Sequence, residues 1–258
     1  MKQYVVDAFT NQIFKGNPAA VCILDEWINE EVMLNIAIEN NLSETAFAVT
    51  NSNQYEIRWF TPGGEVDLCG HATLATAFVI LNFYENTDEI YFKTIDNIQL
   101  SVKRRDTLYE MEFPAYDLKS VNITDEIINA LGVKPNEIFK ARDLLCVLDS
   151  PQSVIDFKPN LDKIEKLEGL LLHITAKGKE YDCVSRSFGP KLNIPEDPVC
   201  GSGHCHIVPY WSEKLNKNNI HAYQASKRSG QLYCKIKNDK VLIAGEATLF
   251  SESKLNIK

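Results

Sequence analysis

The sequence predicts an α+β fold made of two similar halves, each with a helix buried among strands. A short phrase of acidic residues followed by Cys-Gly occurs once in each half, at residues 65–71 and again at 196–202. Each copy leads into a helical stretch, and short runs rich in Val, Ile, Tyr and Phe surround both stretches. The first stretch, 72–81, has almost no polar side chains, and such a helix is buried on most sides. We therefore expect sheets wrapped around a central helix.

Composition limits the classes of function. The chain has 258 residues and a net charge of −8, without the clustered basic face that a nucleic-acid surface needs. It has no run of about 18 apolar residues, so no membrane span is expected. The N-terminal residues enter a strand pattern at once, without a signal-peptide layout, which predicts a cytoplasmic protein. The seven scattered cysteines are then expected to be reduced and mostly buried.

The first half is dominated by strand patterns that turn residues separate. Two helical patterns interrupt them, at 29–39 and at 71–84. The predicted strands are 3–9, 19–24, 45–50, 55–60, 89–93, 98–104 and 108–113.

The second half repeats this theme after a boundary at 114–119. A capped helix is expected at 124–133, with Thr124 at its start and Gly132 near its end. Helices are also predicted at 161–167 and 202–215, and Pro209 should kink the latter or delay its start. The predicted strands are 141–148, 170–175, 181–186, 220–224, 231–237 and 241–250.

Each Cys-Gly turn is predicted to bind an anion. A turn that opens a helix leaves backbone N–H groups unpaired at the positive end of the helix dipole. Glycine at Gly70 and Gly201 lets a ligand approach that backbone closely. Two such turns, one in each half, predict one carboxylate-binding cleft between the halves.

Three polar residues are candidates for chemistry, and each has a structural alternative. Glu44 stands where a helix should end and a strand should begin. It is either a general acid/base or a solvated loop carboxylate. His71 can hold a substrate carboxylate, orient another acid, or cap its helix. Asp197, before Pro198, can orient a base, polarise a substrate amine, or cap the second helix.

The cysteines of the two turns form an alternative catalytic pair. Helix N-termini lower thiol pKa values, so Cys69 and Cys200 can act on opposite faces of a carbon acid, or they can be two buried thiols. The run 204–206, His-Cys-His, does not predict a metal site, because adjacent residues converge poorly on one ion. No P-loop or dinucleotide fingerprint is present, so no nucleotide cofactor is expected.

Read together, these segments resemble the PhzF-like family, which is named for a phenazine-biosynthesis isomerase. The motifs that carry the resemblance run in order along nearly the whole chain. They are residues 7–10, 16–19, 43–47, 58–62, 65–73 and 196–204, with a looser match at 224–230.

The resemblance implies a diaminopimelate epimerase-like fold, with two similar domains, each a central helix wrapped by a curved mixed β-sheet. The domains would be 1–116, joined by the C-terminal strand 245–258, and 117–244, with the active site between them. It also implies a homodimer that needs no metal or organic cofactor and acts on a small carboxylate-bearing metabolite.

The resemblance further assigns roles to matching positions. Glu44 resembles the glutamate that removes a proton from one substrate carbon and returns it to another. Gly70, His71 and Ser202 resemble the groups that hold the substrate carboxylate, and Gly201 belongs to the second of these turns. Asp197 resembles the acidic residue that engages substrate beside the glutamate.

One departure from the family pattern keeps alternatives open. Proteins dedicated to phenazine synthesis generally lack a cysteine at the place of Cys69, which argues against the phenazine intermediate as substrate. The paired Cys-Gly turns look like those of two-cysteine racemases and epimerases. The leading hypothesis is therefore a cofactor-independent isomerase that uses Glu44. The alternatives are a Cys69/Cys200 racemase or epimerase and a non-catalytic binding protein.

Overall fold

The computed structural model describes residues 1–51 and 54–257. The chain forms two compact units, which we call unit 1 (residues 1–112 and 244–258) and unit 2 (residues 113–243). Residues 52, 53 and 258, which the predicted domains include, lie outside the described part. Within that part, no helix has both the length and the apolar character needed to cross a membrane.

Unit 1 is a mixed sheet whose strands pair in the order β18–β1–β2–β3–β4–β6–β7–β8, with β5 also paired to β4. The pairs β2–β3 and β4–β6 are parallel and the others antiparallel. The strands are β1 (Lys2–Ala8), β2 (Asn17–Leu24), β3 (Glu44–Asn51), β4 (Gln54–Thr61), β5 (Gly64–Val66), β6 (Glu89–Lys93), β7 (Gln99–Arg105), β8 (Leu108–Pro114) and β18 (Ala247–Lys254).

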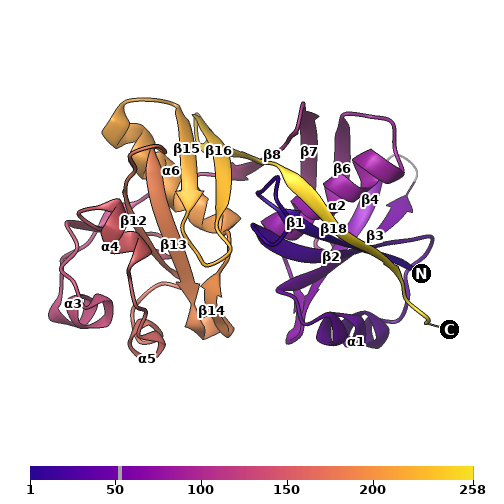
Figure 1. Ribbon diagram of the computed structural model, residues 1–258, viewed down its shortest axis with the longest axis horizontal. Helices are drawn as coiled ribbons and strands as arrows, with labels where there is room; N and C mark the ends of the chain where they lie inside the picture. Colours follow the sequence, from indigo (N-terminus) through magenta and orange to yellow (C-terminus); the bar gives the residue numbers. More distant parts are fainter. Residues whose placement is uncertain (52–53, 258) are drawn as a thin grey trace. The chain divides into compact units, whose positions relative to one another are not determined.

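Two helices make the parallel crossovers of unit 1. Helix α1 (Glu30–Asn40) joins β2 to β3, and α2 (Gly70–Phe83) precedes β6. Ten of the fourteen residues of α2 are buried, and the helix contacts β1, β2, β3, β6, β7 and β18 (Figure 1). Strands therefore surround α2, which explains why its sequence is apolar on nearly every side.

Unit 2 repeats the pairing pattern of unit 1. Its strands follow the order β9–β10–β11–β12–β13–β15–β16, with β14 also paired to β13, and again two pairs, β11–β12 and β13–β15, are parallel. They are β9 (Lys119–Ser120), β10 (Glu137–Lys140), β11 (Leu144–Val147), β12 (Leu172–Lys177), β13 (Cys183–Gly189), β14 (Ile194–Asp197), β15 (Asn219–Gln224), β16 (Gly230–Lys237) and most of β17 (Lys240–Gly245).

The helices of unit 2 take equivalent places. The short helices α4 (Pro151–Ile155) and α5 (Leu161–Ile164) lie between β11 and β12, and α6 (Gly201–Leu215) lies between β14 and β15. Helix α6 contacts β12, β15 and β16. Helix α3 (Asp125–Leu131) precedes β10, with Thr124 as its N-cap and Gly132 at φ 67° as its C-cap, as predicted.

Several predicted boundaries are wrong. The strand predicted at 141–148 is β11, which begins only at Leu144, because Ala141, Arg142 and Asp143 form the turn after β10. Strand β10 itself, at Glu137–Lys140, was not predicted. The strand predicted at 241–250 divides after Gly245 into β17 and β18. A side chain at Gly245 would lie 2.3 Å from the ring of Phe9, so this break needs glycine. The helix predicted at 161–167 ends at Ile164.

Candidate active site

Glu44 reaches its position because α1 ends sharply. Asn41 adopts the left-handed conformation (φ 48°) and donates its N–H to the carbonyl of Ala37. The chain then turns and enters β3 at Glu44, which pairs with Ala19 of β2. The glutamate is thus the first residue of a central strand, and its side chain is only 12% exposed.

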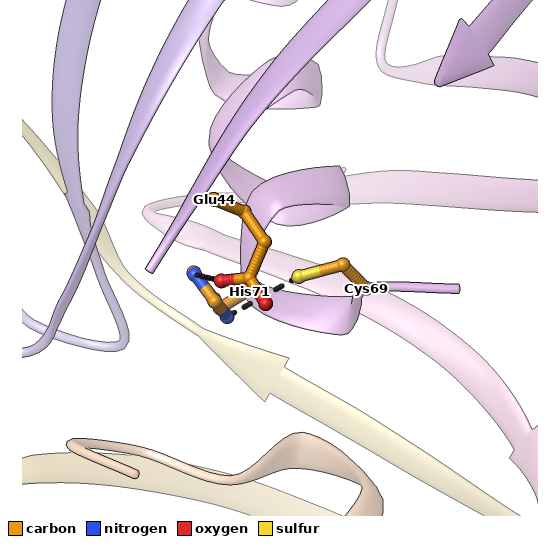
Figure 2. A group of neighbouring side chains, drawn as sticks. All are labelled: Glu44, Cys69 and His71. Carbon is orange, nitrogen blue, oxygen red and sulfur yellow. Dashed lines mark hydrogen bonds and ion pairs between the residues drawn. The ribbon is translucent and has the colours of Figure 1, made fainter. Parts of the chain in front are cut away.

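His71 faces Glu44 from the first turn of α2 (Figure 2). Its Nε2 lies 3.1 Å from Glu44 Oε2, and its own side chain is 8% exposed. The pair is close enough for an ionic contact but lacks hydrogen-bond alignment. Both atoms are buried without a hydrogen-bond partner among the described residues. Because buried polar atoms are nearly always bonded, this pair is suited to a third group that bonds to both.

The other ring nitrogen of His71 is held from two sides. Its Nδ1 lies 3.2 Å from Nδ2 of Asn17 and 3.4 Å from Sγ of Cys69. An amide nitrogen only donates, so in the neutral imidazole Nδ1 accepts and Nε2 carries the proton toward Glu44. Burial alone would lower the pKa of His71, but Cys69 and Glu44 together raise it well above its ordinary value.

The glutamates of the repeated phrase have a structural role. In unit 1, Arg58 of β4 binds Glu65 of β5 through Nε and Nη2, both at 2.6 Å. In unit 2, Arg186 of β13 binds Glu196 of β14 through the same two atoms, at 2.7 and 2.9 Å. Each paired fork fixes the strand that enters the Cys-Gly turn. Sequence reasoning missed both arginines, although each lies on a strand of the repeated pattern.

The second turn is fixed by Gln224 of β15. The backbone N–H of Cys200 donates to Gln224 Oε1 at 2.9 Å, and Gln224 Nε2 donates to the carbonyl of Asp197 at 2.6 Å. Asp197 Oδ1 accepts the N–H of Val199 at 3.2 Å. This last bond holds the backbone of the turn that leads to Cys200, the residue that caps α6.

The two glycines of this turn serve different purposes. A Cβ at Gly201 would meet nothing within 4 Å, so the space beside its Cα at the start of α6 is open. A Cβ at Gly203 would lie 2.7 Å from Cε1 of His173. Gly203 is therefore required by packing, whereas no packing explains Gly201.

Ser202 contacts a charged network that sequence reasoning also missed. Arg142 Nη2 donates to Ser202 Oγ at 3.0 Å and to Oδ2 of Asp143 at 2.6 Å. Asp143 in turn lies 3.1 Å from Nε2 of His173. These residues are far apart in the sequence, and only the adjacency of Arg142 to Asp143 was visible there.

The thiols do not match the expectation of an activated pair. Cys69 and Cys200 precede their helices as N-caps, at 7% and 2% exposure. Burial raises the pKa of both thiols, and the charges of Glu44 and Asp197 raise them further. Desolvation outweighs the helix dipole here, so neither sulfur is a resting thiolate near neutral pH. All seven cysteines are free and buried, as predicted.

Two groups of described side chains have donor atoms within 4.8 Å of one another, the spacing that a metal ion needs. One is Glu44, Cys69 and His71, in which the thiol would have to lose its proton. The other is Asp143, His173 and His206. There His206 Nε2 already accepts the N–H of Asp143 at 3.3 Å, and an ion would compete with the guanidinium of Arg142. The donor chemistry of this second group favours the ion pair over a cation.

A family model described as "Phenazine biosynthesis-like protein" (PhzC-PhzF) matches residues 6–253. The chain belongs to this PhzF family.

Relatives in the PhzF family agree in sequence and structure. The "Uncharacterized isomerase BH0283" of Halalkalibacterium halodurans is 44% identical over 258 residues, covering 98% of this chain and 97% of that protein. The crystal structure of a PhzF family protein from Enterococcus faecalis is 45% identical, with a TM-score of 0.97 and 99% coverage of both chains. Similar proteins are named isomerases, and this PhzF chain is an isomerase of that type.

The fold extends beyond the PhzF family. The structure of a probable proline racemase from Agrobacterium radiobacter has a TM-score of 0.64 at 8% identity and covers 100% of this chain and 93% of that one. This similarity concerns the fold alone, which is a sheet-rich mixture of strands and few helices, as in epimerases and racemases.

Proposed function

We propose that the protein is a cofactor-independent isomerase that moves a proton within a small carboxylate-bearing substrate, with Glu44 as general acid/base. The observation that carries this proposal is the buried contact between Glu44 and His71, in which Oε2 and Nε2 both lack an aligned partner. A carboxylate in that position can accept a proton from substrate carbon, since it is held in place yet not saturated with hydrogen bonds.

The proposed reaction balances without an oxidant or reductant. The C–H proton passes to Glu44 while its electron pair enters the conjugated system of the substrate. Glu44 then returns the proton to a different carbon. His71 holds the carboxylate and stabilises its anionic form before and after transfer. Negative charge on the substrate is met by N–H groups at Gly70 and His71.

In unit 2 we propose that Gly201 and Ser202 bind a substrate carboxylate and that Asp197 engages the substrate. The open space at Gly201 supports this assignment, because a ligand can approach the α6 backbone there.

The second candidate is proton transfer by Cys69 and Cys200. The fold similarity to a proline racemase favours it, but the raised pKa values of both thiols argue against it. A binding-only role agrees less well with a family whose members are named isomerases.

Deuterium exchange separates these candidates. Small carboxylates with an acidic C–H bond are incubated with the protein in D2O, and deuterium uptake is followed by proton NMR. We expect Glu44→Gln to lose exchange by about 100-fold or more, since general acid/base groups contribute about 10²–10⁴. Cys69→Ser and Cys200→Ser should retain most of it.

Glu39→Gln is the matched control, because it makes the same change at an exposed carboxylate of α1. Full activity in Glu44→Gln together with loss in both cysteine variants would show that the thiols carry the proton. Ligand binding without deuterium uptake in any compound would favour the binding-only role.

A further inference from the structure

The Arg142–Asp143 pair is the most unusual charged feature of unit 2. The two residues form the turn before β11, and the guanidinium binds the carboxylate through Nε at 3.1 Å and Nη2 at 2.6 Å. The Asp143 side chain has no exposed surface, whereas 36% of the Arg142 side chain is exposed. A buried anion thus anchors a cation that reaches the surface.

The carboxylate of Asp143 is ionised at neutral pH. Asp143 accepts the backbone N–H of Leu171 at 3.3 Å and lies 3.1 Å from His173 Nε2. Burial alone would raise the pKa of Asp143, but hydrogen bonds from His173 and Arg142 hold it well below its ordinary value. The carboxylate therefore stays ionised at any physiological pH and keeps the guanidinium in one orientation.

An aromatic stack supports the guanidinium on its face. Its Cζ lies 5.4 Å from the ring centroid of Tyr116, and that ring stacks on His206 at 4.1 Å. The hydrogen bonds to Asp143 and Ser202 use Nε and Nη2, so neither of these partners occupies the hydrogens of Nη1. Nη1 is therefore the part of this fixed cation that these two partners leave for a ligand.

The hydroxyl of Ser202 adds a further donor. Ser202 Oγ accepts from Arg142 Nη2 at 3.0 Å and lies 3.5 Å from Sγ of Cys200, where either atom can donate. When the thiol is the donor of that contact, the hydroxyl hydrogen of Ser202 can be directed to a ligand. An Arg N–H and a Ser O–H side by side match the two oxygens of one carboxylate.

The repeated turns differ at this position. His71 and Ser202 both stand two residues after the turn cysteine, yet His71 faces a carboxyl group, Glu44, and Ser202 faces a cation, Arg142. The first turn is equipped to transfer a proton and the second to hold an anion.

We infer that Arg142 is a specificity-determining residue that recognises a carboxylate of the substrate through Nη1, together with the hydroxyl of Ser202. Asp143 and His173 act through Arg142 as positioning residues. The inference rests on the proposed function for the identity of the site, and it adds that the enzyme selects carboxylates over the corresponding neutral amides.

Equilibrium binding tests the inference without any turnover. Benzoate and succinate are compared with benzamide and succinamide by ligand-observed NMR titration. We expect the wild-type protein to bind at least one acid about 10-fold or more tightly than its amide. Arg142→Gln should abolish this preference, and Arg142→Lys should restore it in part, because lysine keeps the charge but lacks the planar fork.

Two controls keep the result interpretable. Lys134→Gln removes an exposed positive charge of unit 2 and should leave the preference unchanged. Arg142→Lys covers the case in which Arg142→Gln fails to fold, because it leaves a cation beside Asp143.

The inference is overturned if the acid preference survives in Arg142→Gln. It is also overturned if the preference is lost in Arg142→Lys and in Lys134→Gln alike. A wild-type protein that binds no acid better than its amide overturns it as well. The same experiments separate this inference from the proposed function. We expect Glu44→Gln to keep the acid preference and to lose deuterium exchange. If Glu44→Gln keeps deuterium exchange, the proposed function fails and the inference about Arg142 does not.

Discussion

Replacing the two glycines of the second turn with alanine should give opposite results, although they are two residues apart. At Gly203 the new Cβ would lie 2.7 Å from Cε1 and 2.9 Å from Nδ1 of His173, and 3.2 Å from Oγ of Ser187. At Gly201 it would meet nothing within 4 Å. The two substitutions are chemically identical and differ only in the space available.

The cost at Gly203 follows from these distances. Carbon atoms pack at about 3.5–4.0 Å, so the histidine ring or the helix has to move by about 1 Å. His173 is fully buried and bonded to Asp143 and Ser187, so it cannot yield freely. Overpacking of this kind costs about 1–3 kcal/mol, and the better helix propensity of alanine offsets up to about 1 kcal/mol.

We therefore expect Gly203→Ala to lower the free energy of unfolding by about 1–2 kcal/mol. Gly201→Ala should leave it unchanged or raise it by a few tenths of a kcal/mol, about what helix propensity gives at a helix end. Urea denaturation followed by circular dichroism measures both values. Equal stabilities for the two variants would refute the packing argument.

The same pair of variants tests the site. If a ligand approaches the open backbone at Gly201, the stable Gly201→Ala variant should lose binding of carboxylates or deuterium exchange. Wild-type exchange and binding in that variant would remove Gly201 from the site, because no change in folding could mask the result.

Three further results are expected. By NMR titration the imidazole of His71 should have a pKa above its ordinary value of about 6.5. Glu44→Gln should lower this pKa, because it removes a negative charge beside the ring. The contribution of protonated His71 to stability is complete below about pH 6.5 and is lost as the pH rises through the folded-state pKa. An unshifted His71 in the wild-type protein would contradict the contact. Asp143→Asn should cost about 1.5–3 kcal/mol at neutral pH, since it removes the buried carboxylate that accepts charged hydrogen bonds from Arg142. Because folding lowers the pKa of Asp143, the difference in free energy of unfolding between Asp143→Asn and wild type should shrink as the pH falls below about 4. A difference that stays constant through an acid denaturation series would contradict an ionised Asp143. Arg186→Gln should destabilise by about 3 kcal/mol or more, because it breaks charged hydrogen bonds to Glu196 and to three backbone carbonyls, two of them buried. Thermal unfolding that matches wild type would refute that role.

Local sequence signals predicted the parts of the fold that depend on neighbours in the chain. The helix predicted at 71–84 is α2, at Gly70–Phe83, because its apolar character on all sides has no other explanation. The helix predicted at 29–39 is α1, which Asn29 caps by accepting the N–H of Glu31. The predicted helix at 202–215 is α6, and Pro209 lies inside it.

Long-range polar contacts were out of reach of such signals. Arg142 and Ser202 are 60 residues apart, and Asp143 and His173 are 30 apart. Nothing in either local pattern distinguishes these residues from solvated side chains. The raised thiol pKa values of Cys69 and Cys200 escaped prediction for a related reason, because burial depends on what other segments pack over the turn.

The pairing of β18 with β1 has a consequence for synthesis of the protein. Strand β1 lies between β2 and β18, and Lys2 to Ala8 align with Lys254 to Ala247 across the whole ladder (Figure 1). While the ribosome translates unit 2, residues 2–8 have emerged but their partner strand does not yet exist. The nascent chain then exposes a largely apolar strand edge, the kind that pairs with other chains. Unit 2 has all of its own strands before unit 1 does, so the order of completion in the cell is the reverse of the order in the sequence.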